Sequence, residues 1–323
     1  MKRRYLRNLL GGITVSLFFL YFAVRNVSLE RFLSSFHGVS LELVVLGAFF
    51  MVLSLYVRGY RWNYVLGEEF SSHSLFEYNS MGWCLNHFLP ARMGELAKAY
   101  LAGNREDESK TFLLGTVAVS RFFDILIVLI LAVSAGLILA IDLPSLIFWL
   151  GSGTVMAGFG GMFFLDRYPD AVLRLVKFLP SPLQDRIEDH VELLVDGFTA
   201  IDGMGQMIKV FLSSALVWIP HVVGILILMQ AFGLEAAFLS AAFLVGVEAL
   251  GGMIPSSPGN LGTHEYFAVT ALGLLGVEKS TALGFAVFYH VTNYGVVVLI
   301  SIPLFLKHSS EMRKIREKGD LSV

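Results

Sequence analysis

Long runs of apolar residues alternate with short polar segments along most of this chain. Six runs are long enough, or nearly so, to cross the ~30 Å hydrocarbon core of a bilayer as α-helices that rise ~1.5 Å per residue. These runs lie at Leu9–Val24, Leu41–Val57, Phe112–Ile141, Ser145–Leu165, Val210–Phe232 and Ala282–Leu306. The pattern predicts an all-α, polytopic integral membrane protein with six transmembrane helices.

Two further apolar stretches do not fit as spans, because proline and glycine interrupt them. Glu77–Leu101 is broken at "FLPARMGEL", and Phe238–Val277 is broken at "IPSSPGNLG". Each half is too short to cross, so each stretch is expected to enter the membrane, turn and leave by the same face as a re-entrant hairpin. Lipid tolerates such a broken backbone only where protein or a polar cavity covers it. The residues expected to make the breaks are Pro90, Gly94, Pro255, Pro258, Gly259 and Gly262.

The two breaks resemble each other, since both read Pro-x-x-x-Gly-x-Leu. Pro90, Gly94 and Leu96 match Pro255, Gly259 and Leu261 at a single offset. Each broken segment follows two predicted spans and precedes one, so each half holds an odd number of crossings. The halves, about 1–142 and 143–308, are therefore expected to form an inverted repeat within one membrane domain of residues 1–323. The first hairpin would enter from the cytoplasm and the second from outside.

Composition supports the membrane class. The chain is 55% hydrophobic and 15% charged, with a mean hydropathy of +0.68, values that exclude an ordinary soluble domain. Lysine and arginine collect on the flanks that share a side with the N-terminus, which predicts cytoplasmic N- and C-termini in the plasma membrane and a charged cytoplasmic tail at 309–323. Residues 182–201 show helical apolar spacing with an acidic polar face, as expected of a cytoplasmic helix packed under the bundle or, alternatively, of a partner site.

Polar and ionisable residues also lie at membrane depth, where a charge costs several kcal/mol and usually marks a pathway. We interpret them as candidates for substrate binding and translocation. They are Arg92, Glu95, Lys98, Arg121, Asp124, Glu248, Asn260, His264, Glu265, His290 and Asn293.

Spacing suggests roles for some of these residues. Arg92, Glu95 and Lys98 recur every three positions and so line one face of the half-helix that starts near Gly94. The N-terminal amides of that half-helix favour an anion. Arg92 and Lys98 are therefore expected to bind a phosphate, with Arg121 supporting them. The carboxylates would balance this charge, accept a cationic group or carry protons.

Structural interpretations remain open for several positions. Arg121 and Asp124 are three apart and would pair on one helix face. Asn260 and Glu265 are suited to capping and turn formation. The histidines at 264 and 290 are candidates for energy coupling, because a buried histidine readily titrates near neutral pH.

Two further features have simpler interpretations. His221 follows Pro220 and is expected to be a core hydrogen-bonding residue. Arg58, Arg61 and Trp62 in "RGYRWNYVL" are expected to form an interfacial belt that anchors the second span at the headgroups.

Several catalytic signatures are missing from the sequence. His264-Glu265 lacks a second histidine at zinc-binding spacing, and there is neither a phosphate-binding Gly-rich loop ending in Lys-Ser/Thr nor a Gly-x-Ser-x-Gly elbow. Cys84 is the only cysteine, which excludes an intrachain disulfide and a cysteine-based metal cluster. We therefore expect a transporter-like protein that uses no cofactor and no metal ion, rather than an enzyme.

Four motifs together resemble the lysylphosphatidylglycerol synthase transmembrane-region family: "NHFLPARMGELAKAYLA", "SRFFDILIVL", "GGMIPSSPGNLGTHEY" and "FYHVTNYG". The resemblance covers nearly the whole chain and implies a flippase-like membrane fold with re-entrant helices that moves lipids, such as aminoacylated phosphatidylglycerol, between leaflets. The family's members that are fused to an aminoacyl-transferase domain make the modified lipid, and this sequence, which shows no such domain, is not expected to make it. The resemblance points to Pro90, Arg92, Gly94, Glu95, Arg121, Asp124, Pro255, Pro258, Gly259, Gly262, Glu265, His290 and Asn293.

The function expected from the sequence is translocation of an anionic, aminoacylated or polyprenyl-phosphate-type lipid through a polar groove between the two hairpins. The alternatives are an accessory subunit or transferase component of a glycolipid or polyprenyl-phosphate pathway, and a carrier of ions or small solutes. The expected partners are the lipid substrate and the bilayer, with a separately encoded lipid-modifying enzyme or a second copy of this chain as further candidates. No nucleic acid partner is expected.

Overall fold

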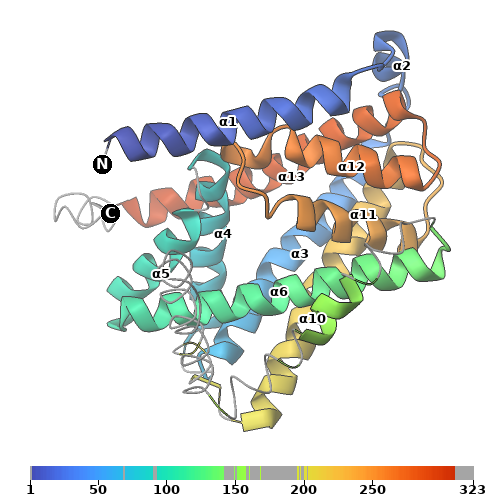
Figure 1. Cartoon of the computed structure of the whole chain (residues 1–323). Helices are drawn as coiled ribbons and strands as arrows, with labels where there is room; N and C mark the ends of the chain where they lie inside the picture. The colour runs from blue at the N-terminus through green and yellow to red at the C-terminus, as the bar shows by residue number, and fades with distance from the viewer. Residues whose placement is uncertain are drawn as a thin grey trace.

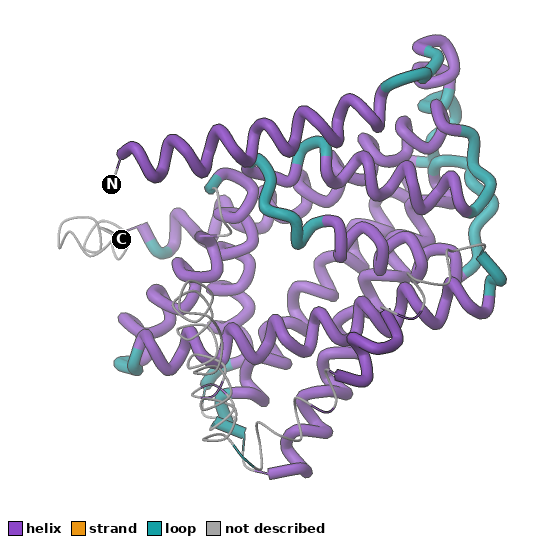
Figure 2. The backbone as a smooth tube through the Cα atoms, viewed as in Figure 1, coloured by secondary structure: helices purple, strands orange, loops and turns teal. Residues whose placement is uncertain are grey.

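The computed structural model describes residues 2–67, 70–89, 93–141, 151–157 and 203–309, together with the single positions 149, 160, 168, 195, 197, 200 and 201. Within this part of the chain every regular element is a helix, as Figure 2 shows, which confirms the predicted all-α class. The helix expected at 182–201 and the tail expected at 309–323 lie almost wholly outside the described residues.

Four described helices are long and apolar enough to cross a membrane. They are α3 (Leu41–Val65), α6 (Lys110–Ile138), α10 (Gly203–Ala231) and α13 (Lys279–Lys307), and each contains most of one predicted span. Helix α1 (Lys2–Val24) contains the first predicted span, but its apolar part, Leu10–Val24, is shorter than these four. The span predicted at Ser145–Leu165 lies mostly outside the described residues, so the count of six is not confirmed.

Polar residues fix the points at which several helices begin. The Ser40 hydroxyl accepts a hydrogen bond from the backbone amide of Leu43 at the start of α3, and Ser109 does the same at the start of α6. At the start of α13, the Glu278 carboxylate accepts hydrogen bonds from the amides of Ser280 and Thr281 at 2.9 and 3.1 Å. These side chains satisfy amides that have no partner inside the helix.

Both predicted interruptions are present as pairs of short helices. The first pair is α4 (Ser72–Phe88) with α5 (Met93–Glu106); the second is α11 (Phe238–Gly251) with α12 (Thr263–Leu274), joined through the short helix η2 (Pro258–Asn260). The helices of each pair pack against one another. At ~1.5 Å per residue none of them reaches ~30 Å, so none crosses a bilayer alone.

Glycine makes the turn geometry possible at both breaks. A Cβ atom on Gly94 would lie 1.9 Å from the carbonyl oxygen of Gly82, so α4 and α5 approach this closely only because residue 94 has no side chain. In the second break, Gly259 and Gly262 have φ angles of 75° and 87°, in the left-handed region that favours glycine. These glycines therefore lie at the interruptions, in a conformation or at a close approach that favours glycine, whereas Pro90 lies outside the described residues.

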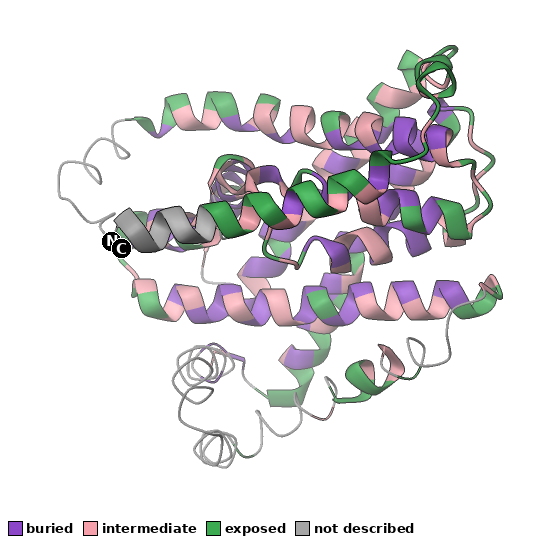
Figure 3. Cartoon of the chain, turned by 45° about the horizontal axis from the view of Figure 1, so that its top comes forward, coloured by how far each residue is buried: buried purple, intermediate pink, exposed green. Residues whose placement is uncertain are grey.

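The described helices form two large apolar cores and a small third one around Leu55, Cys84 and Val297. One large core joins α10, α11, α12 and α13, and the other joins α4, α5, α6 and the C-terminal part of α3. In Figure 1, α1 lies along one side over α12 and α13, and α6 lies along the opposite side. Helix α1 runs across the front of Figure 3, where most of its described residues are exposed, as suits a helix that faces lipid.

The two helix pairs lie toward opposite ends of the molecule. In Figure 1, α4 and α5 lie near the end where α1 begins and α13 finishes, and α11 and α12 lie toward the other end. Between these ends η2 packs directly against α4. The second break therefore lies beside the C-terminal part of α4, where Gly259 is close to the carbonyl oxygen of His87.

Candidate functional site

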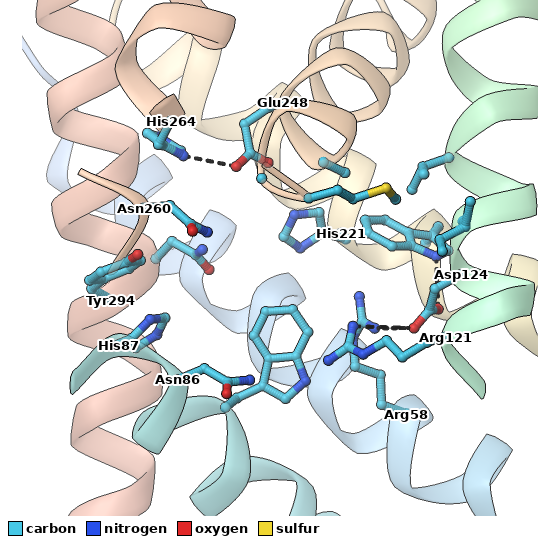
Figure 4. A pocket seen from close by; sticks show the side chains of 18 of the residues that line it. Arg58, Asn86, His87, Arg121, Asp124, His221, Glu248, Asn260, His264 and Tyr294 are labelled. Atoms are coloured by element: carbon cyan, nitrogen blue, oxygen red, sulfur yellow. Dashed lines mark hydrogen bonds and ion pairs between the residues drawn. The ribbon is translucent and has the colours of Figure 1, made fainter. Parts of the chain in front are cut away.

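A cavity of about 250 Å³ lies where the two interrupted segments meet. Figure 4 shows Arg58, Arg121 and Asp124 on one side, His264, Glu248 and Asn260 on the other, and His221 between them. The polar and aromatic residues that line the cavity are Arg58, Trp83, Asn86, His87, Glu95, Arg121, Asp124, Trp218, His221, Glu248, Asn260, His264, Tyr289, Asn293 and Tyr294.

Asp124 is the centre of the basic side. Its carboxylate accepts hydrogen bonds from Arg58 Nη1 at 3.3 Å, from Arg61 Nη1 and Nη2 at 3.1 and 3.3 Å, and from Trp218 Nε1 at 3.2 Å. Arg121 Nη1 lies 3.6 Å from the same carboxylate, so the pairing expected from the i, i+3 spacing is confirmed. The Asp124 carboxylate on α6 therefore interacts with two arginines from α3 and one from α6.

The expected interfacial belt at Arg58, Arg61 and Trp62 is wrong. The two arginines are 4% exposed and Trp62 is 1% exposed, because α3 turns this face toward α6 and not toward the headgroups. Trp62 Nε1 donates a hydrogen bond to Thr116 Oγ1 at 3.0 Å, which satisfies its only polar atom inside the protein.

Glu95 connects α5 to the arginine cluster. Its carboxylate forms an ion pair with Arg121 and lies 2.8 Å from Lys98 Nζ, so the expected neighbours on the α5 face do meet. Lys98 lies behind the cavity wall, where its ammonium also donates to Asn79 Oδ1 at 3.0 Å. Arg92, the third member of the predicted face, lies outside the described residues.

The basic side carries an excess of positive charge. Four basic groups, Arg58, Arg61, Lys98 and Arg121, share two carboxylates, Asp124 and Glu95, among the described residues. The formal excess is 4 − 2 = 2 positive charges, and most of these side chains are buried. Burying unbalanced charge is costly, so this wall favours an anion.

Indole rings hold Arg58 in place. Its guanidinium carbon lies 4.8 Å from the ring centres of both Trp83 and Trp218, and that of Arg121 lies 5.1 Å from Trp83. Cation–π contacts of this kind contribute ~0.5–2 kcal/mol each, depending on how far the cation is desolvated. Because Asp124 is its only hydrogen-bonding acceptor among the described residues, Arg58 presents donors toward the cavity.

Two histidine–carboxylate pairs form the opposite wall. His264 Nδ1 lies 2.9 Å from Glu248 Oε1, and His290 Nδ1 is bonded to Glu265 Oε1. The two imidazole rings are 4.2 Å apart between centres. His290 Nε2 also lies 3.1 Å from the carbonyl oxygen of Gly259, and this hydrogen bond connects the wall to the second break.

Glu265 serves both of the roles that its sequence context allowed. Its Oε2 accepts a hydrogen bond from the Gly262 amide at 2.6 Å, which is the expected capping of α12, while Oε1 faces His290. Asn260 takes part in the turn, where Ser256 Oγ donates to its Oδ1 at 3.3 Å, and it also lines the cavity.

Tyr294 joins the first break to the second. Its hydroxyl donates to the Gly259 carbonyl oxygen, and its ring stacks on His87 with the centres 3.6 Å apart. His221, expected to be a core hydrogen-bonding residue, has its Nε2 3.3 Å from the Tyr289 hydroxyl and also lines the cavity. Aromatic and imidazole groups therefore line the cavity together with the arginines.

A second, apolar groove of about 750 Å³ runs along the outside of this wall. Helices α1, α12 and α13 and the short helix α2 (Leu29–Ser34) form it. Glu265 and His290 lie in its wall, and Tyr294 lines both this groove and the polar cavity. Its remaining lining is almost entirely aliphatic and aromatic: Leu20, Val24, Val27, Leu29, Phe32, Leu261, Leu283, Val287 and Val291.

The structure thus brings together most of the predicted residues. Glu95, Arg121, Asp124, Glu248, Asn260, His264 and Asn293 line the cavity, Lys98 supports it, and Glu265 and His290 line the adjacent groove. Sequence reasoning missed Arg58, Arg61, Asn86, Trp83, Trp218 and Tyr294 as site residues. The available signal was the three-residue spacing of Arg58 and Arg61, the same spacing that marked Arg121 and Asp124.

Among the described residues, no three or more histidine, cysteine or acidic side chains are gathered in an arrangement that holds a metal ion.

Comparisons with known proteins find matches over most of the chain. Residues 9–301 match the family model described as the lysylphosphatidylglycerol synthase TM region. The chain is similar to a UPF0104 membrane protein of Methanothermobacter thermautotrophicus, with 24% identity over 306 residues that cover 87% of each chain. A UPF0104 membrane protein of Methanocaldococcus jannaschii is 23% identical over 68% of this chain and 92% of its own.

A third relative has a different printed name. The glycosyltransferase AglD of Haloferax volcanii is 24% identical over 84% of this chain, and the match covers 51% of that protein. No solved structure was found to match the chain.

Proposed function

Because this chain belongs to the lysylphosphatidylglycerol synthase TM region family, we propose that it is a lipid translocase that moves a lipid with an anionic headgroup between leaflets. It is a membrane protein with several apolar helices. The proposal concerns the lipid that the helices carry. The candidate substrates are anionic, aminoacylated and polyprenyl-phosphate-type lipids, which share a phosphate group.

The observation that carries the proposal is the buried excess of positive charge beside a cavity. Arg58 and Arg121 line the cavity, Arg61 and Lys98 lie behind them, and the carboxylates that pair with these four groups among the described residues are Asp124 and Glu95. A charge inside a membrane protein usually faces a polar interior and marks a pathway. Guanidinium groups fit phosphate oxygens well, since each presents several N–H donors in a plane.

The apolar groove supports a lipid rather than a free ion as the substrate. Tyr294 lines both the polar cavity and the groove, so the two spaces lie on either side of one side chain. A headgroup in the cavity would have room for a hydrocarbon chain along α1 and α13. A free ion would make no favourable contact with an aliphatic surface of this kind.

Placement of the broken helices supports an inverted repeat. The two pairs lie toward opposite ends of the molecule, and Figure 1 shows that α1 begins near the end where α13 finishes. We propose that the halves, about 1–142 and 143–308, rock against each other around the cavity, with both termini in the cytoplasm. Six spans in the plasma membrane belong to the same proposal.

The test is lipid movement by the purified protein in liposomes. Fluorescent phosphatidylglycerol, aminoacylated phosphatidylglycerol and polyprenyl phosphate are placed in separate phosphatidylcholine vesicles, and dithionite quenching reports transfer between leaflets. Arg121→Gln should slow transfer about 10-fold or more, since a hydrogen bond to a charged group contributes ~1.5–3 kcal/mol.

Arg25→Gln is the matched control, because Arg25 is exposed and lies away from the cavity. It should transfer lipid at the wild-type rate. If wild-type protein moves none of these lipids faster than empty vesicles, the translocase proposal fails.

The similarity to a protein named glycosyltransferase favours a second candidate, a membrane component of a glycolipid or polyprenyl-phosphate pathway. This candidate predicts that membranes without the protein transfer less sugar to polyprenyl phosphate, while liposomes show no lipid movement. An ion or small-solute carrier would instead give substrate-dependent currents with no lipid transfer. The liposome assay therefore separates all three.

A further inference from the structure

Tyr294 separates the polar cavity from the apolar groove. Among the described residues it is the one that lines both spaces, so the wall between them is one side chain thick at this point. Figure 4 shows Tyr294 beside His87 and Asn260, across the cavity from Arg121 and Asp124. A group that moves from the groove into the cavity by the shortest way therefore passes Tyr294.

The groove is open to the surroundings of the protein. Val291, Leu29 and Leu261 line it and are 68%, 69% and 57% exposed. Apolar side chains exposed to this extent on a membrane protein face the lipid tails, which are as apolar as leucine. A lipid in the bilayer therefore reaches the groove from the side, and its hydrocarbon chains stay in an apolar environment throughout.

Contacts with two other elements hold Tyr294 in this position. Its hydroxyl donates a hydrogen bond to the carbonyl oxygen of Gly259 in η2, and its ring stacks on His87 of α4, with the ring centres 3.6 Å apart. Gly259 leaves room for the ring, since a Cβ atom there would lie 3.0 Å from Tyr294 Cε2. Both contacts come from the Tyr294 side chain, so a change of its rotamer breaks them without a change in the backbone.

These contacts connect the two halves of the chain. His87 belongs to the first half, whereas Tyr294 and Gly259 belong to the second, so a movement of one half relative to the other separates the stacked rings. The Gly259 carbonyl oxygen keeps a hydrogen-bonding partner when Tyr294 leaves, because His290 Nε2 lies 3.1 Å from the same oxygen. Opening the wall therefore avoids the free-energy cost of a buried carbonyl group without a partner.

From this geometry we propose that Tyr294 is a lateral gate. A lipid lies with its chain in the groove, the Tyr294 ring swings away from Gly259 and His87, and the headgroup passes sideways into the polar cavity. Opening of this gate sets the rate of transfer. The inference rests on the proposed lipid translocation and adds the route of entry and the residue that controls it.

Substitutions at position 294 test the gate in the liposome assay. Tyr294→Phe keeps the ring on His87 but loses the hydrogen bond to Gly259, so the gate opens more easily and fluorescent phosphatidylglycerol should be transferred ~2- to 10-fold faster. Tyr294→Ala removes both contacts, and its transfer should be faster than that of wild type by ~10-fold or more. The matched control is Tyr60→Ala, because Tyr60 is an exposed residue of α3 outside the cavity lining, and its rate should equal that of wild type.

A reversible bridge tests the same gate by holding it closed. In a Cys84→Ala background, His87→Cys with Tyr294→Cys places two thiols at the positions whose rings stack in the native protein. Joining them with a short bis-methanethiosulfonate should stop transfer, and reduction should restore it. Methyl methanethiosulfonate, which modifies both thiols without joining them, should leave transfer in progress. The matched pair is Tyr60→Cys with Tyr64→Cys, one turn apart on α3, where bridging should leave the rate unchanged.

The outcomes separate the gate from translocation itself. If Tyr294→Phe transfers lipid at the wild-type rate or more slowly, the hydroxyl does not hold a gate closed, and the inference is overturned. Continued transfer through the bridged protein at its unbridged rate also overturns it, and both results leave translocation standing. Absence of lipid movement by wild type under every condition overturns translocation and, with it, the gate.

Discussion

Asp124→Asn is the substitution that most directly tests how the buried charges are held. Asp124 accepts four hydrogen bonds, three from Arg58 and Arg61 and one from Trp218. Asparagine has nearly the same size but no charge, and its NH₂ group would face guanidinium donors. The substitution therefore leaves the geometry almost unchanged and raises the local charge excess from two to three.

The magnitude follows from the burial of the pair. Removing one partner of a buried ion pair destabilises a protein by ~3–5 kcal/mol, because the remaining charge has no counterion. Since 1 kcal/mol corresponds to a shift of ~2–4 °C for a chain of a few hundred residues, the melting temperature should fall by roughly 10 °C.

The only cysteine provides the assay. Cys84 is free and 5% exposed, so a dye that becomes fluorescent on reaction with a thiol reports unfolding of detergent-purified protein during heating. Asp107→Asn is the control, because Asp107 is exposed and has a φ of 55°, a conformation that asparagine also adopts readily. Its melting temperature should stay within about 1–2 °C of wild type, as expected for a surface change.

A second substitution tests the charge argument itself. Arg61→Met combined with Asp124→Asn returns the charge excess to two, so the double variant should be more stable than the sum of the single effects predicts, by ~1 kcal/mol or more. If Asp124→Asn melts like Asp107→Asn, or if the two effects simply add, the cluster is not held by charge balance.

Three further predictions concern the break, the arginine wall and the groove. Gly94→Ala should lower stability by ~1–3 kcal/mol, because the new Cβ would collide with a backbone carbonyl oxygen, whereas Gly205→Ala, with open space around it, should be neutral or slightly stabilising in the same thermal assay. Arg58→Lys should slow transfer of phosphate-bearing lipids severalfold in liposomes, since an ammonium cannot fill the planar site between two indoles, and a wild-type rate would contradict this. Val291→Trp should slow transfer by filling the apolar groove, and Leu299→Trp, exposed elsewhere on the same helix, should not.

The pattern of apolar and polar residues along the sequence was sufficient to predict the long helices. Helices α3, α6, α10 and α13 follow from uninterrupted apolar runs, because a helix is the only single segment that satisfies its own backbone in lipid. The two interruptions were also visible, since proline and glycine leave no other interpretation of so apolar a stretch. The inverted repeat and the six spans stay predictions.

Long-range pairing was not visible in the sequence. An arginine near the end of an apolar run, such as Arg58 or Arg61, has the same sequence context whether it reaches the headgroups or turns inward. Only the packing of α3 against α6 and α10 brought these side chains to Asp124, more than sixty positions along the chain, and to Trp218.

The sequence by itself therefore determined the class of protein, the long helices and the places where two segments break, because these depend on local backbone chemistry. Tertiary structure alone decided which buried groups meet. Pairs at i, i+3 such as Arg121 with Asp124 are an intermediate case: the sequence predicts that they are close, since the helix fixes their spacing, but it does not predict their other partners. The partnership of His290 with Glu265 across two helices depends on the fold, because charge balance inside a membrane is a property of neighbours in space and not of neighbours along the chain.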